Sequence, residues 1–453
     1  MYTCGPTVYF NAHIGNLRTY VFEDVFKRIL LFNGYKVKHV MNITDVGHLT
    51  SDADSGEDKM EMGARREGRT VWQLAEFYTQ EFRKDLARLN VIEPDVWCKV
   101  TDHIPEQIEL IQRLEAKGFT YVIADGVYFD TSKLSDYGKL SRLNVEGLQA
   151  GARVEMVEGK RNITDFALWK FSPKGQQRQM EWPSPWGVGF PGWHIECSAL
   201  AIKYLGERLD IHCGATDAIP IHHNNEIAQS EAALGHEWVN WWMHGEFLTL
   251  PKAGGGEGKM SKSSGGFLTL NTLIERGYDP LAWRYVCLGA HYRQQLAFTW
   301  EALDAAVSAL DRLRARVLEL KAGGADAATG ADLSSAGPVG RHLEPFRQAV
   351  RDDLNMPRAL AAMWGLLRDG DLPAAQVYAT LVRMDRVLGL GIEVMAPAKQ
   401  EIPPEIMELV RQREQARKAR DFAKADRLRS ELAKRGATVK DSPAGPRITY
   451  EPR

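Results

Sequence analysis

The first 44 residues of the chain show strand, helix and strand patterns in the order that builds a parallel sheet. Residues 1–7 and 36–44 have the composition of short strands, and residues 17–32 carry apolar side chains at helical spacing. The pair Asn33-Gly34 is typical of a helix C-terminus. A strand, a helix and a second strand make a βαβ unit, so we predict an α/β fold built on a parallel sheet.

Cys4, His13 and Thr44 lie near the carboxyl ends of these two predicted strands. In an open parallel sheet, ligands bind at the carboxyl ends of the strands. The three residues therefore mark the expected position of a site. For His13 alone, the commoner interpretation is a strand-to-helix cap with no catalytic part.

The pattern changes twice in the following segments. Residues 51–69 are charged and contain glycine, which predicts a mobile loop, and residues 71–89 have the pattern of an amphipathic helix. Residues 91–186 contain short strands among turn-rich loops, and residues 193–247 return to the βα pattern. We interpret residues 91–186 as an insertion within a nucleotide-binding domain.

The remainder of the chain is predicted to be mostly helical. Residues 279–320 have helical periodicity, whereas residues 322–340 are rich in Gly, Ala, Ser and Asp, the composition of a flexible linker. Helical patterns then continue to Leu390. A proline-bearing break at residues 397–404 precedes a final basic helix.

Length and composition limit the class of protein. With 453 residues, 44% hydrophobic and 26% charged, the chain is long enough for several soluble domains. No apolar run approaches the roughly 18 residues of a spanning helix, and no secretory signal is recognisable. The five cysteines are scattered and odd in number, which predicts a reducing, cytoplasmic environment where thiols serve as metal ligands.

The net charge of −2 means that any contact with nucleic acid must use a local basic patch. Residues 411–435 carry ten Lys and Arg against four Asp and Glu. For an isolated segment, a solvated helix face with charge pairs is the commoner explanation. The segment is nevertheless a candidate surface for RNA.

Residues 258–263, Gly-Lys-Met-Ser-Lys-Ser, have the composition of a loop that closes over a triphosphate. Lys259 and Lys262 supply charge for phosphate oxygens, serine hydroxyls supply short donors, and the glycines at 254–256 let the loop swing. Such a loop alone is more often polar surface. Its counterpart is the run His13-Ile14-Gly15-Asn16, where a helix is expected to begin directly after a strand and to favour anions at its N-terminus.

Candidate metal ligands gather in one later part of the chain. His222 and Glu226 are four residues apart, which places both on one face of a helix. With Cys197, and with Cys4 if the first strand lies beside this half, they form a set suited to tetrahedral zinc. Three other residues compete as ligands: His194, His212 and Cys213. The remaining alternative is that the histidines are hydrogen-bonded core residues without a metal.

The two nucleotide-binding motifs, in this order and on either side of a long insertion, resemble the signature motifs of class I aminoacyl-tRNA synthetases. Residues 2–9 (Tyr-Thr-Cys-Gly-Pro-Thr-Val-Tyr), the Trp-His-Ile-Glu-Cys run in 192–198, and residues 222–230 resemble cysteinyl-tRNA synthetases. The resemblance continues through residues 353–357 and 416–426, so it covers nearly the whole chain. It implies a Rossmann-like parallel-sheet catalytic domain with an inserted connective subdomain, followed by an α-helical anticodon-binding region.

The resemblance implies a ligase that activates cysteine with ATP and transfers it to a cysteine tRNA. In that family one zinc ion is held by the cysteine of the first strand, the cysteine of the Trp-His-Ile-Glu-Cys run, and a His and Glu spaced by four. These correspond here to Cys4, Cys197, His222 and Glu226. Zinc would bind the substrate as a thiolate and so distinguish it from serine.

The nucleotide-binding residues are carried over in the same way. Lys262, with Lys259, corresponds to the lysine motif assigned to ATP, which brings Mg²⁺. His13, Gly15 and Asn16 correspond to the motif that contacts the phosphates. No membrane contact is expected, and we expect the chain to act as a monomer.

The amino-acid pocket of the family corresponds to four residues: Thr44, Trp193, His212 and Asp217. Asp217 is expected to hold the substrate ammonium group, and Trp193 to form an apolar wall. The alternatives are that Trp193 is a core residue and that Asp217 caps the next helix.

The resemblance also implies a division of the chain into segments. These are 1–90 and 191–247 for the two halves of the catalytic domain, 91–190 for the connective insertion, 248–321 for the lysine loop and stem-contact helices, 322–340 for the linker, 341–396 for the helical anticodon-binding domain, and 397–453 for a small basic C-terminal module.

The sequence departs from the family pattern at a few positions. Asn16 stands where a second histidine is usual, and asparagine keeps a donor but not a titratable ring. Asn224 replaces a common glutamate, residues 448–450 lack the usual tryptophan, and residues 45–59 follow a less common form of their loop. The chain also begins later than is usual in the family.

Two rival functions remain open. A cysteine ligase of mycothiol synthesis, which joins cysteine to an amino-sugar, shares the catalytic half but usually lacks the full helical C-terminal part, so residues 340–453 favour tRNA. A catalytically inactive zinc-dependent RNA-binding protein is disfavoured because His13, Lys259, Lys262 and the four candidate ligands are all present.

Overall fold

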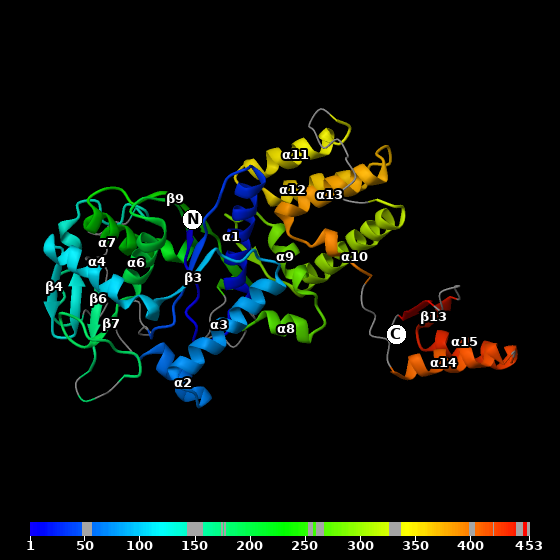
Figure 1. Ribbon diagram of the computed structural model, residues 1–453, viewed down its shortest axis with the longest axis horizontal. Helices are drawn as coiled ribbons and strands as arrows, with labels where there is room; N and C mark the ends of the chain where they lie inside the picture. Colours follow the sequence, from blue (N-terminus) through cyan, green and yellow to red (C-terminus); the bar gives the residue numbers. More distant parts are fainter. Residues whose placement is uncertain are drawn as a thin grey trace. The chain divides into compact units, whose positions relative to one another are not determined.

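A five-stranded parallel sheet forms the centre of the first part of the chain (Figure 1). Its strands run in the order β3-β2-β1-β8-β9, and every neighbouring pair is parallel. The strands are Tyr2–Thr3 (β1), Val40–Ile43 (β2), Val96–Lys99 (β3), Leu209–Ala215 (β8) and Val239–Gly245 (β9). This sheet confirms the predicted Rossmann-like α/β fold. The strand order reverses between β1 and β8, which is where ligands bind in sheets of this kind.

The computed structural model divides into two compact units, Met1–Val394 and Met395–Arg453. The residues that it describes are 1–47, 57–142, 157–173, 175, 178–251, 257–259, 267–325, 337–397, 404–419, 421–440 and 447–450. Lys262, the glycines at 254–256 and much of the expected linker lie outside these ranges. Within the ranges, no helix combines the length and the apolar character needed to cross a membrane.

Helix α1, Ile14–Phe32, connects β1 to β2 and confirms the predicted crossover helix. It ends at Asn33 and Gly34, where Gly34 has a φ of 89° that favours glycine. The helix contacts β8, β9, α9 and α13. Side chains on several of its faces are therefore buried.

The mobile loop predicted for residues 51–69 is wrong for its later part, which forms helix α2, Lys59–Glu67. Asp58 caps this helix by accepting hydrogen bonds from the amides of Met60 and Glu61, and Gly68 ends it with a φ of 65°. Its contact with α3, Val71–Arg88, buries the few apolar side chains, which are too sparse for a periodicity signal.

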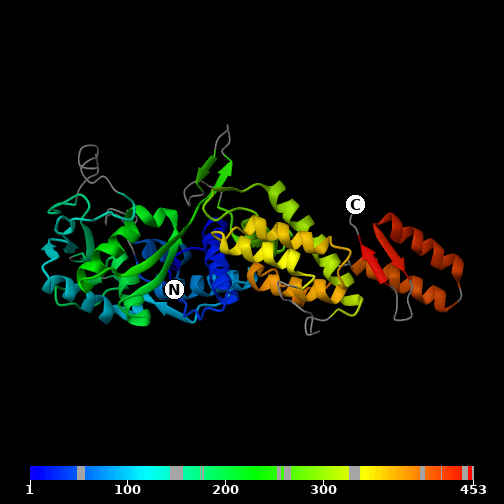
Figure 2. The same cartoon turned by 90° about the horizontal axis from the view of Figure 1, so that it is seen from above.

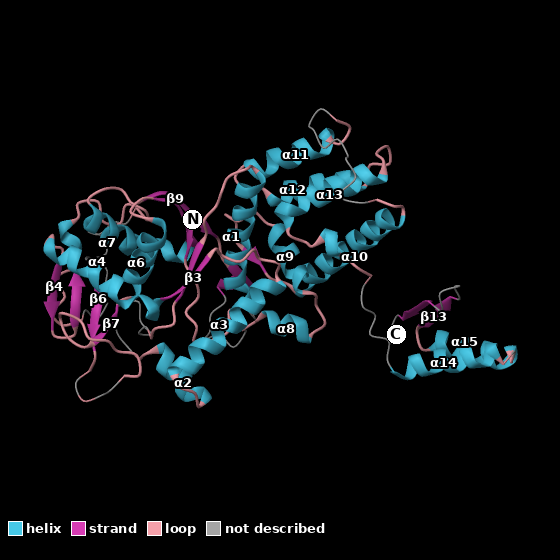
Figure 3. Ribbon diagram, in the orientation of Figure 1, coloured by secondary structure: helices cyan, strands magenta, loops and turns pink. Residues whose placement is uncertain are grey.

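Between β3 and β8 the chain adds an antiparallel sheet in the order β4-β5-β6-β7 (Figure 3). Its strands are Thr120–Ile123 (β4), Gly126–Phe129 (β5), Phe166–Phe171 (β6) and Gly189–Pro191 (β7). The accompanying helices are Ile104–Ala116 (α4), Trp193–Leu205 (α6) and Asn224–Leu234 (α7), with short turns at Val100–His103 (η1), Thr131–Lys133 (η2), Thr216–Ala218 (η3) and Ile219–His223 (η4). β3 lies inside the predicted insertion range yet pairs with β2 in the parallel sheet.

The rest of the first unit is a small sheet followed by packed helices (Figure 2). The sheet has the order β11-β10-β12, with Leu248–Pro251 as β10, Glu257–Lys259 as β11 and Leu296–Ala297 as β12. The helices are Leu270–Glu275 (α8), Pro280–Leu288 (α9), Trp300–Ala322 (α10), Gly340–Arg351 (α11), Met356–Leu367 (α12) and Ala374–Leu388 (α13), followed by the turn Ile392–Val394 (η5). Contacts among α11, α12 and α13 place these helices side by side.

The second unit contains more than the single basic helix predicted from the sequence. It has two helices, Pro404–Lys418 (α14) and Phe422–Lys434 (α15), and a hairpin of Ala437–Lys440 (β13) with Arg447–Tyr450 (β14). Ile406, Val410 and Leu432 form its core together with two small hairpin residues. Pairs such as Arg435 with Glu431 lie on the exposed side, as the solvated-face interpretation predicts.

Glu23 on α1 is an unpaired carboxyl group in the core beneath the site. It is 1% exposed, and neither carboxylate oxygen has a hydrogen-bond partner among the described residues. Burial raises its pKa well above the ordinary value of 4.5. Since this pKa is higher in the folded than in the unfolded protein, stability falls as pH rises from the unfolded pKa toward the folded one.

We therefore expect Glu23→Leu to stabilise the first unit by about 1–3 kcal/mol at neutral pH. The gain is expected to shrink near pH 4, where the unfolded chain is also protonated. Urea denaturation at the two pH values measures both quantities. A loss of stability at neutral pH, or a gain independent of pH, would contradict the assignment.

Candidate active site and metal centre

A cavity of about 300 Å³ opens at the carboxyl ends of β1 and β8, where the strand order reverses. Its lining includes many of the residues predicted for the site: Cys4, His13, Asn16, Thr44, Trp193, Cys197, Asp217 and His222. The predicted residues His212 and Glu226 do not line the cavity, and both are 0% exposed. The structure thus brings together residues from both halves of the parallel sheet.

Cys4 and Cys197 meet although 193 positions separate them. Cys4 follows β1 directly, and Cys197 lies in the first half of α6, which contacts β2 and β8. Their Sγ atoms are 3.8 Å apart. The expectation that the first strand lies beside the second half of the sheet is borne out by this distance.

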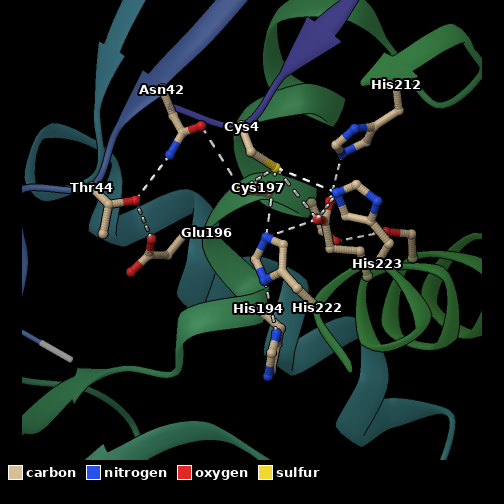
Figure 4. A network of polar contacts seen from close by, with 12 residues as sticks. Cys4, Asn42, Thr44, His194, Glu196, Cys197, His212, His222 and His223 are labelled. Atoms are coloured by element: carbon tan, nitrogen blue, oxygen red, sulfur yellow. Dashed lines mark hydrogen bonds and ion pairs between the residues drawn. The ribbon is translucent and has the colours of Figure 1, made fainter. Parts of the chain in front are cut away.

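His222 and Glu226 complete the first of two possible ligand sets, and Figure 4 shows His222 beside Cys4. The His222 Nε2 atom lies 2.9 Å from Glu226 Oε1 and 3.7 Å from Cys4 Sγ. The helix here is not a uniform α-helix, because Ile219–His223 form a π-helical turn that runs into α7. The ligand atoms of Cys4, Cys197, His222 and Glu226 all lie within 4.8 Å of one another.

A second set shares Cys4 and Glu226 but replaces the other two ligands by His212 and His223. His212 Nε2 lies 2.8 Å from Glu226 Oε2, and His223 Nε2 lies 3.7 Å from Cys4 Sγ. The sequence analysis missed His223, because no suitable ligand follows it by four residues. His223 and Glu226 are three residues apart, and residues at this spacing also lie on one face of a helix. This spacing could have marked His223 as a candidate ligand.

Further histidines surround the two sets rather than join them. His194 Nδ1 lies 2.9 Å from His222 Nδ1, and His223 Nδ1 lies 2.8 Å from His244 Nε2. Such contacts orient an imidazole and fix which nitrogen faces a metal. Cys213, the third predicted competitor, is buried on β8 and belongs to neither set.

The electrostatics of the cluster favour the anionic forms of Cys197 and Glu226 but the neutral form of Cys4. Burial alone would raise the pKa of Glu226, but His212 and His222 beside it hold that pKa well below 4.5. A hydrogen bond from the Cys4 thiol lowers the pKa of Cys197 to about 7 against the effect of burial. The same hydrogen bond, together with burial, raises the pKa of Cys4 well above 9.0.

The donor chemistry of the cluster fits zinc. Thiolate, imidazole and carboxylate groups are the ligands that zinc prefers, and either set supplies four of them. Burial lowers the pKa of His222, but Glu226 outweighs this effect and raises the pKa to about 10. Because metal ligands must be deprotonated, an ion would displace this proton on binding.

The amino-acid side of the cavity contains Thr44, Trp193 and Asp217. The Thr44 hydroxyl donates to Glu196 Oε2 at 3.2 Å, and the Asn42 amide donates to Thr44 at 3.0 Å. Trp193 stacks on His222 with 4.6 Å between ring centroids. Asp217 lies in the turn η3 on the cavity lining. Asn42 and Glu196 were not among the site residues predicted from the sequence, although Asn42 lies in the predicted strand of residues 36–44 and Glu196 in the Trp-His-Ile-Glu-Cys run.

The nucleotide side of the cavity is the N-terminus of α1. His13 Nδ1 accepts from the Asn16 amide at 2.9 Å, and Asn16 Oδ1 accepts from the His13 amide at 3.3 Å. This reciprocal pair is a capping box. The prediction that His13 caps the helix is therefore confirmed, whereas its catalytic role stays a prediction. A Cβ atom on Gly15 would lie 2.9 Å from His13 Nδ1, so the cap requires glycine.

Residues 267 and 268, which follow the lysine motif in the chain, contact the N-terminus of this helix. The amide of Ile14 donates to the carbonyl of Leu268 at 2.9 Å, and the rings of His13 and Phe267 are 5.4 Å apart. Lys259 is the last residue of β11, whereas Lys262 lies outside the described residues.

Comparisons with known families agree with this geometry. Residues 1–308 match the family model of the tRNA synthetases class I (C) catalytic domain, and residues 399–447 match that of the cysteinyl-tRNA ligase anticodon binding domain. The fold is also similar to a methionyl-tRNA synthetase of Mycobacterium tuberculosis bound by methionyl-adenylate. That likeness has a TM-score of 0.56 and 17% identity over 87% of this chain and 91% of the other, and it supports the fold alone.

Relatives at higher identity match along nearly the whole chain. A protein of Burkholderia lata, Cysteine–tRNA ligase 1, is 55% identical over 448 residues, which cover 99% of this chain and 92% of that protein. A cysteine–tRNA ligase of Treponema denticola is 45% identical over 97% of this chain and 93% of its own length. Because the catalytic-domain model covers well over half of its residues and such relatives cover nearly all of them, the chain belongs to the cysteine–tRNA ligases, a family of class I aminoacyl-tRNA synthetases.

Proposed function

We propose that this chain activates L-cysteine with ATP to cysteinyl-adenylate and then transfers the cysteinyl group to the 3′ end of a cysteine tRNA. The observation that carries the proposal is one cavity that borders both the sulfur and histidine cluster and the N-terminus of α1. A substrate side chain near the cluster and a carboxylate near the helix N-terminus would both lie within this cavity. In the first step that carboxylate attacks the α-phosphorus of Mg²⁺-bound ATP, and pyrophosphate leaves.

This step requires positioning and charge stabilisation more than a protein acid or base. The N-terminus of α1 favours phosphate oxygens, and the capping box holds the His13 ring across it. The side-chain oxygen of Asn16 accepts a hydrogen bond within the cap. The side-chain NH₂ group of Asn16 is therefore the donor proposed to face phosphate. Lys259 and Lys262 would neutralise the charge that develops on pyrophosphate.

The amino acid would be held by residues on the opposite side of the cavity. The Asp217 carboxylate is suited to the substrate ammonium group, and the Trp193 ring, fixed by stacking on His222, supplies an apolar wall. Thr44 and His212 would support the pocket through their contacts with Glu196 and Glu226.

A zinc ion held by Cys4, Cys197, His222 and Glu226 would supply a preference for sulfur over hydroxyl oxygen. Without it, a pocket that must separate two side chains differing by one atom discriminates by only roughly 10- to 200-fold. The contact between His194 and His222 orients the imidazole toward Cys4 and Glu226. The chain therefore holds its four donors in place independently of the substrate.

The tRNA would be bound by the helical parts of the chain. The second unit carries the basic helices α14 and α15, and residues 399–447 match the cysteinyl-tRNA ligase anticodon binding model, so anticodon binding is proposed for this unit as well as for the helices of residues 341–396. These parts disfavour the amino-sugar ligase. The proposed division into catalytic halves, insertion, linker and C-terminal module keeps the boundaries given above, except that β3 pairs within the main sheet.

Two assays and a metal analysis test the function. Cysteine-dependent ATP–pyrophosphate exchange together with charging of purified cysteine tRNA supports the proposal. Exchange without charging would point to the amino-sugar ligase, and the absence of both, with zinc and tRNA still bound, would point to a binding protein. Metal analysis of the purified protein is expected to find one zinc per chain.

The two overlapping ligand sets give opposite predictions for single substitutions. If the first set holds the metal, Cys197→Ser should lower zinc affinity by more than about 100-fold, because a ligand contributes more than its neighbours do. His223→Asn should then cost no more than about 10- to 100-fold. Competition with a chelating dye measures both affinities, with Cys213→Ser as a buried-thiol control. The reverse order would assign the metal to His212 and His223.

A further inference from the structure

Arg18 is a buried guanidinium whose surroundings contain carbonyl groups instead of a paired acid. It lies on α1 one turn after the His13–Asn16 cap and is 4% exposed. Among the described residues, no carboxylate forms an ion pair with it. Burying a charge without a counter-ion is costly, so its hydrogen bonds must offset a large desolvation penalty.

The hydrogen bonds of Arg18 reach two separate segments of the chain. One terminal nitrogen donates to the carbonyl of Glu246 at 2.8 Å and to that of Phe247. The other donates to the carbonyl of Gln294 at 2.5 Å and lies 3.4 Å from that of His291. A guanidinium presents its donors in a rigid fork, so it can hold both segments at once.

These two segments lead directly into the small sheet that carries the lysine motif. Residues 246–247 precede β10, and residue 294 precedes β12, which pairs with β10 in parallel. β10 also pairs with β11, whose last residue is Lys259. Arg18 therefore binds the backbone just before β10, the first strand of the β10–β11 hairpin that contains Lys259.

A second attachment ties the other end of the lysine motif to the same helix. The Ile14 amide donates to the carbonyl of Leu268 at 2.9 Å, and His13 forms an antiparallel bridge with Thr269. Residues 246–247 before the lysine motif and residue 268 after it therefore both contact α1. Arg18 supplies the anchor on the N-terminal side of that motif.

We propose that Arg18 is a positioning residue that sets the lysine-bearing hairpin relative to the phosphate-binding N-terminus of α1. This inference rests on the proposed adenylation function. Arg18 does not line the cavity of the site; it acts through the backbone of residues 246–247 and 294. Since misplacement by about 1 Å can cost roughly 100-fold in rate, loss of this anchor should appear in the use of ATP.

The test is ATP–pyrophosphate exchange with ATP and cysteine varied separately. Arg18→Met, which keeps an unbranched stem but removes the guanidinium donors, is expected to lower kcat/KM for ATP by roughly 100-fold. Its KM for cysteine and its zinc content are expected to stay near the wild-type values. Arg18→Lys, which keeps the charge but cannot reach both segments, should recover part of the loss.

A matched control is Arg28→Met on the far half of the same helix. Arg28 is also buried and donates to the backbone carbonyl of Asn90 at 2.5 Å, but it is far from the lysine hairpin along the helix. Loss of Arg28 should lower the free energy of unfolding without changing the kinetic parameters for ATP more than those for cysteine. If Arg18→Met fails to fold, Arg18→Lys carries the test, with hydrogen exchange of the Leu248 and Thr249 amides as the second readout.

The outcomes distinguish this inference from the proposed function. A folded Arg18 variant with wild-type ATP parameters, or with equal losses for ATP and cysteine, overturns the positioning role alone. A wild-type protein without cysteine-dependent exchange overturns the proposed function instead.

Discussion

Replacing Cys4 with serine is expected to remove zinc from the purified protein and to weaken its selection of cysteine over serine to the level of a pocket without a metal. Cys4 belongs to both possible ligand sets, so this result does not depend on which set holds the ion. Serine is nearly the same size but is a far poorer metal ligand, since its hydroxyl does not ionise as a thiol does. Zinc affinity should fall by more than about 100-fold.

The measurement combines metal analysis with ATP–pyrophosphate exchange, using cysteine and serine as alternative substrates. The ratio of kcat/KM for the two amino acids is expected to fall toward the roughly 10- to 200-fold limit of a pocket without a metal. Cys98→Ser is the matched control, because Cys98 is a buried thiol whose sulfur donates to the Met41 carbonyl and which lies in neither set. Its zinc content and selectivity should be unchanged.

A Cys4→Ser protein that keeps one zinc per chain would place the metal elsewhere. A protein that loses zinc but still prefers cysteine as strongly as the wild type would separate the metal from selection. The first outcome contradicts the site, and the second contradicts the role proposed for it.

The first ligand set shows how far residue types and spacing can be taken. The spacing of His222 and Glu226 predicted a shared helix face, and their 2.9 Å contact agrees with it. The sequence could not separate this set from the one with His212 and His223. That ambiguity arises because His212 lies on a strand, and its approach to Glu226 depends on how β8 packs against α7.

Local sequence patterns predicted the long apolar helix but not the short helix that has few apolar residues. The long apolar face of α1 predicted that helix to within a few residues, and Gly34 ended it as expected. α2 was missed because its stability comes from the Asp58 cap and from packing on α3 rather than from its own periodicity.

Residues that act through distant backbone groups carried no sequence signal at all. In the sequence, Arg18 looks like any charged residue of an amphipathic helix. Only the fold shows that its hydrogen-bond acceptors are the carbonyl groups of residues 246–247 and 294. The carbonyl groups that it binds belong to every residue type, so no motif could mark them.

Asp24 is another buried charged residue on α1, and its removal is expected to give the largest loss of stability. Asp24 Oδ2 accepts from Arg28 Nε at 2.7 Å and from Arg284 at 2.6 Å, and Oδ1 accepts from the Ile92 amide at 2.7 Å. Arg284 is 0% exposed and also donates to the carbonyl of Leu388 at 2.7 Å. This cluster joins α1 to α9 and to the end of α13.

Asp24→Ala would leave two buried guanidinium groups without their shared carboxylate. We expect the free energy of unfolding to fall by about 3–5 kcal/mol, the usual cost of removing one partner of a buried ion pair. The exposed pair of Asp352 and Arg358, 2.9 Å apart, provides the control. Asp352→Ala should cost no more than about 1 kcal/mol, because solvent screens that pair.

The effect of Asp24 should depend on pH with a definite sign. Burial alone would raise its pKa, but Arg284, Arg28 and the Ile92 amide outweigh burial and hold the pKa below 3.8. A carboxyl group with a depressed folded pKa contributes stability that is present above the unfolded pKa, about 3.9, and is lost as pH falls through the folded value.

Urea denaturation should therefore show a constant difference in the free energy of unfolding between wild type and Asp24→Ala near neutral pH. The difference should narrow only in the acid range below the unfolded pKa. A difference that grew on acidification would mean that Asp24 is protonated in the folded protein and that the two arginines are held by backbone carbonyls instead.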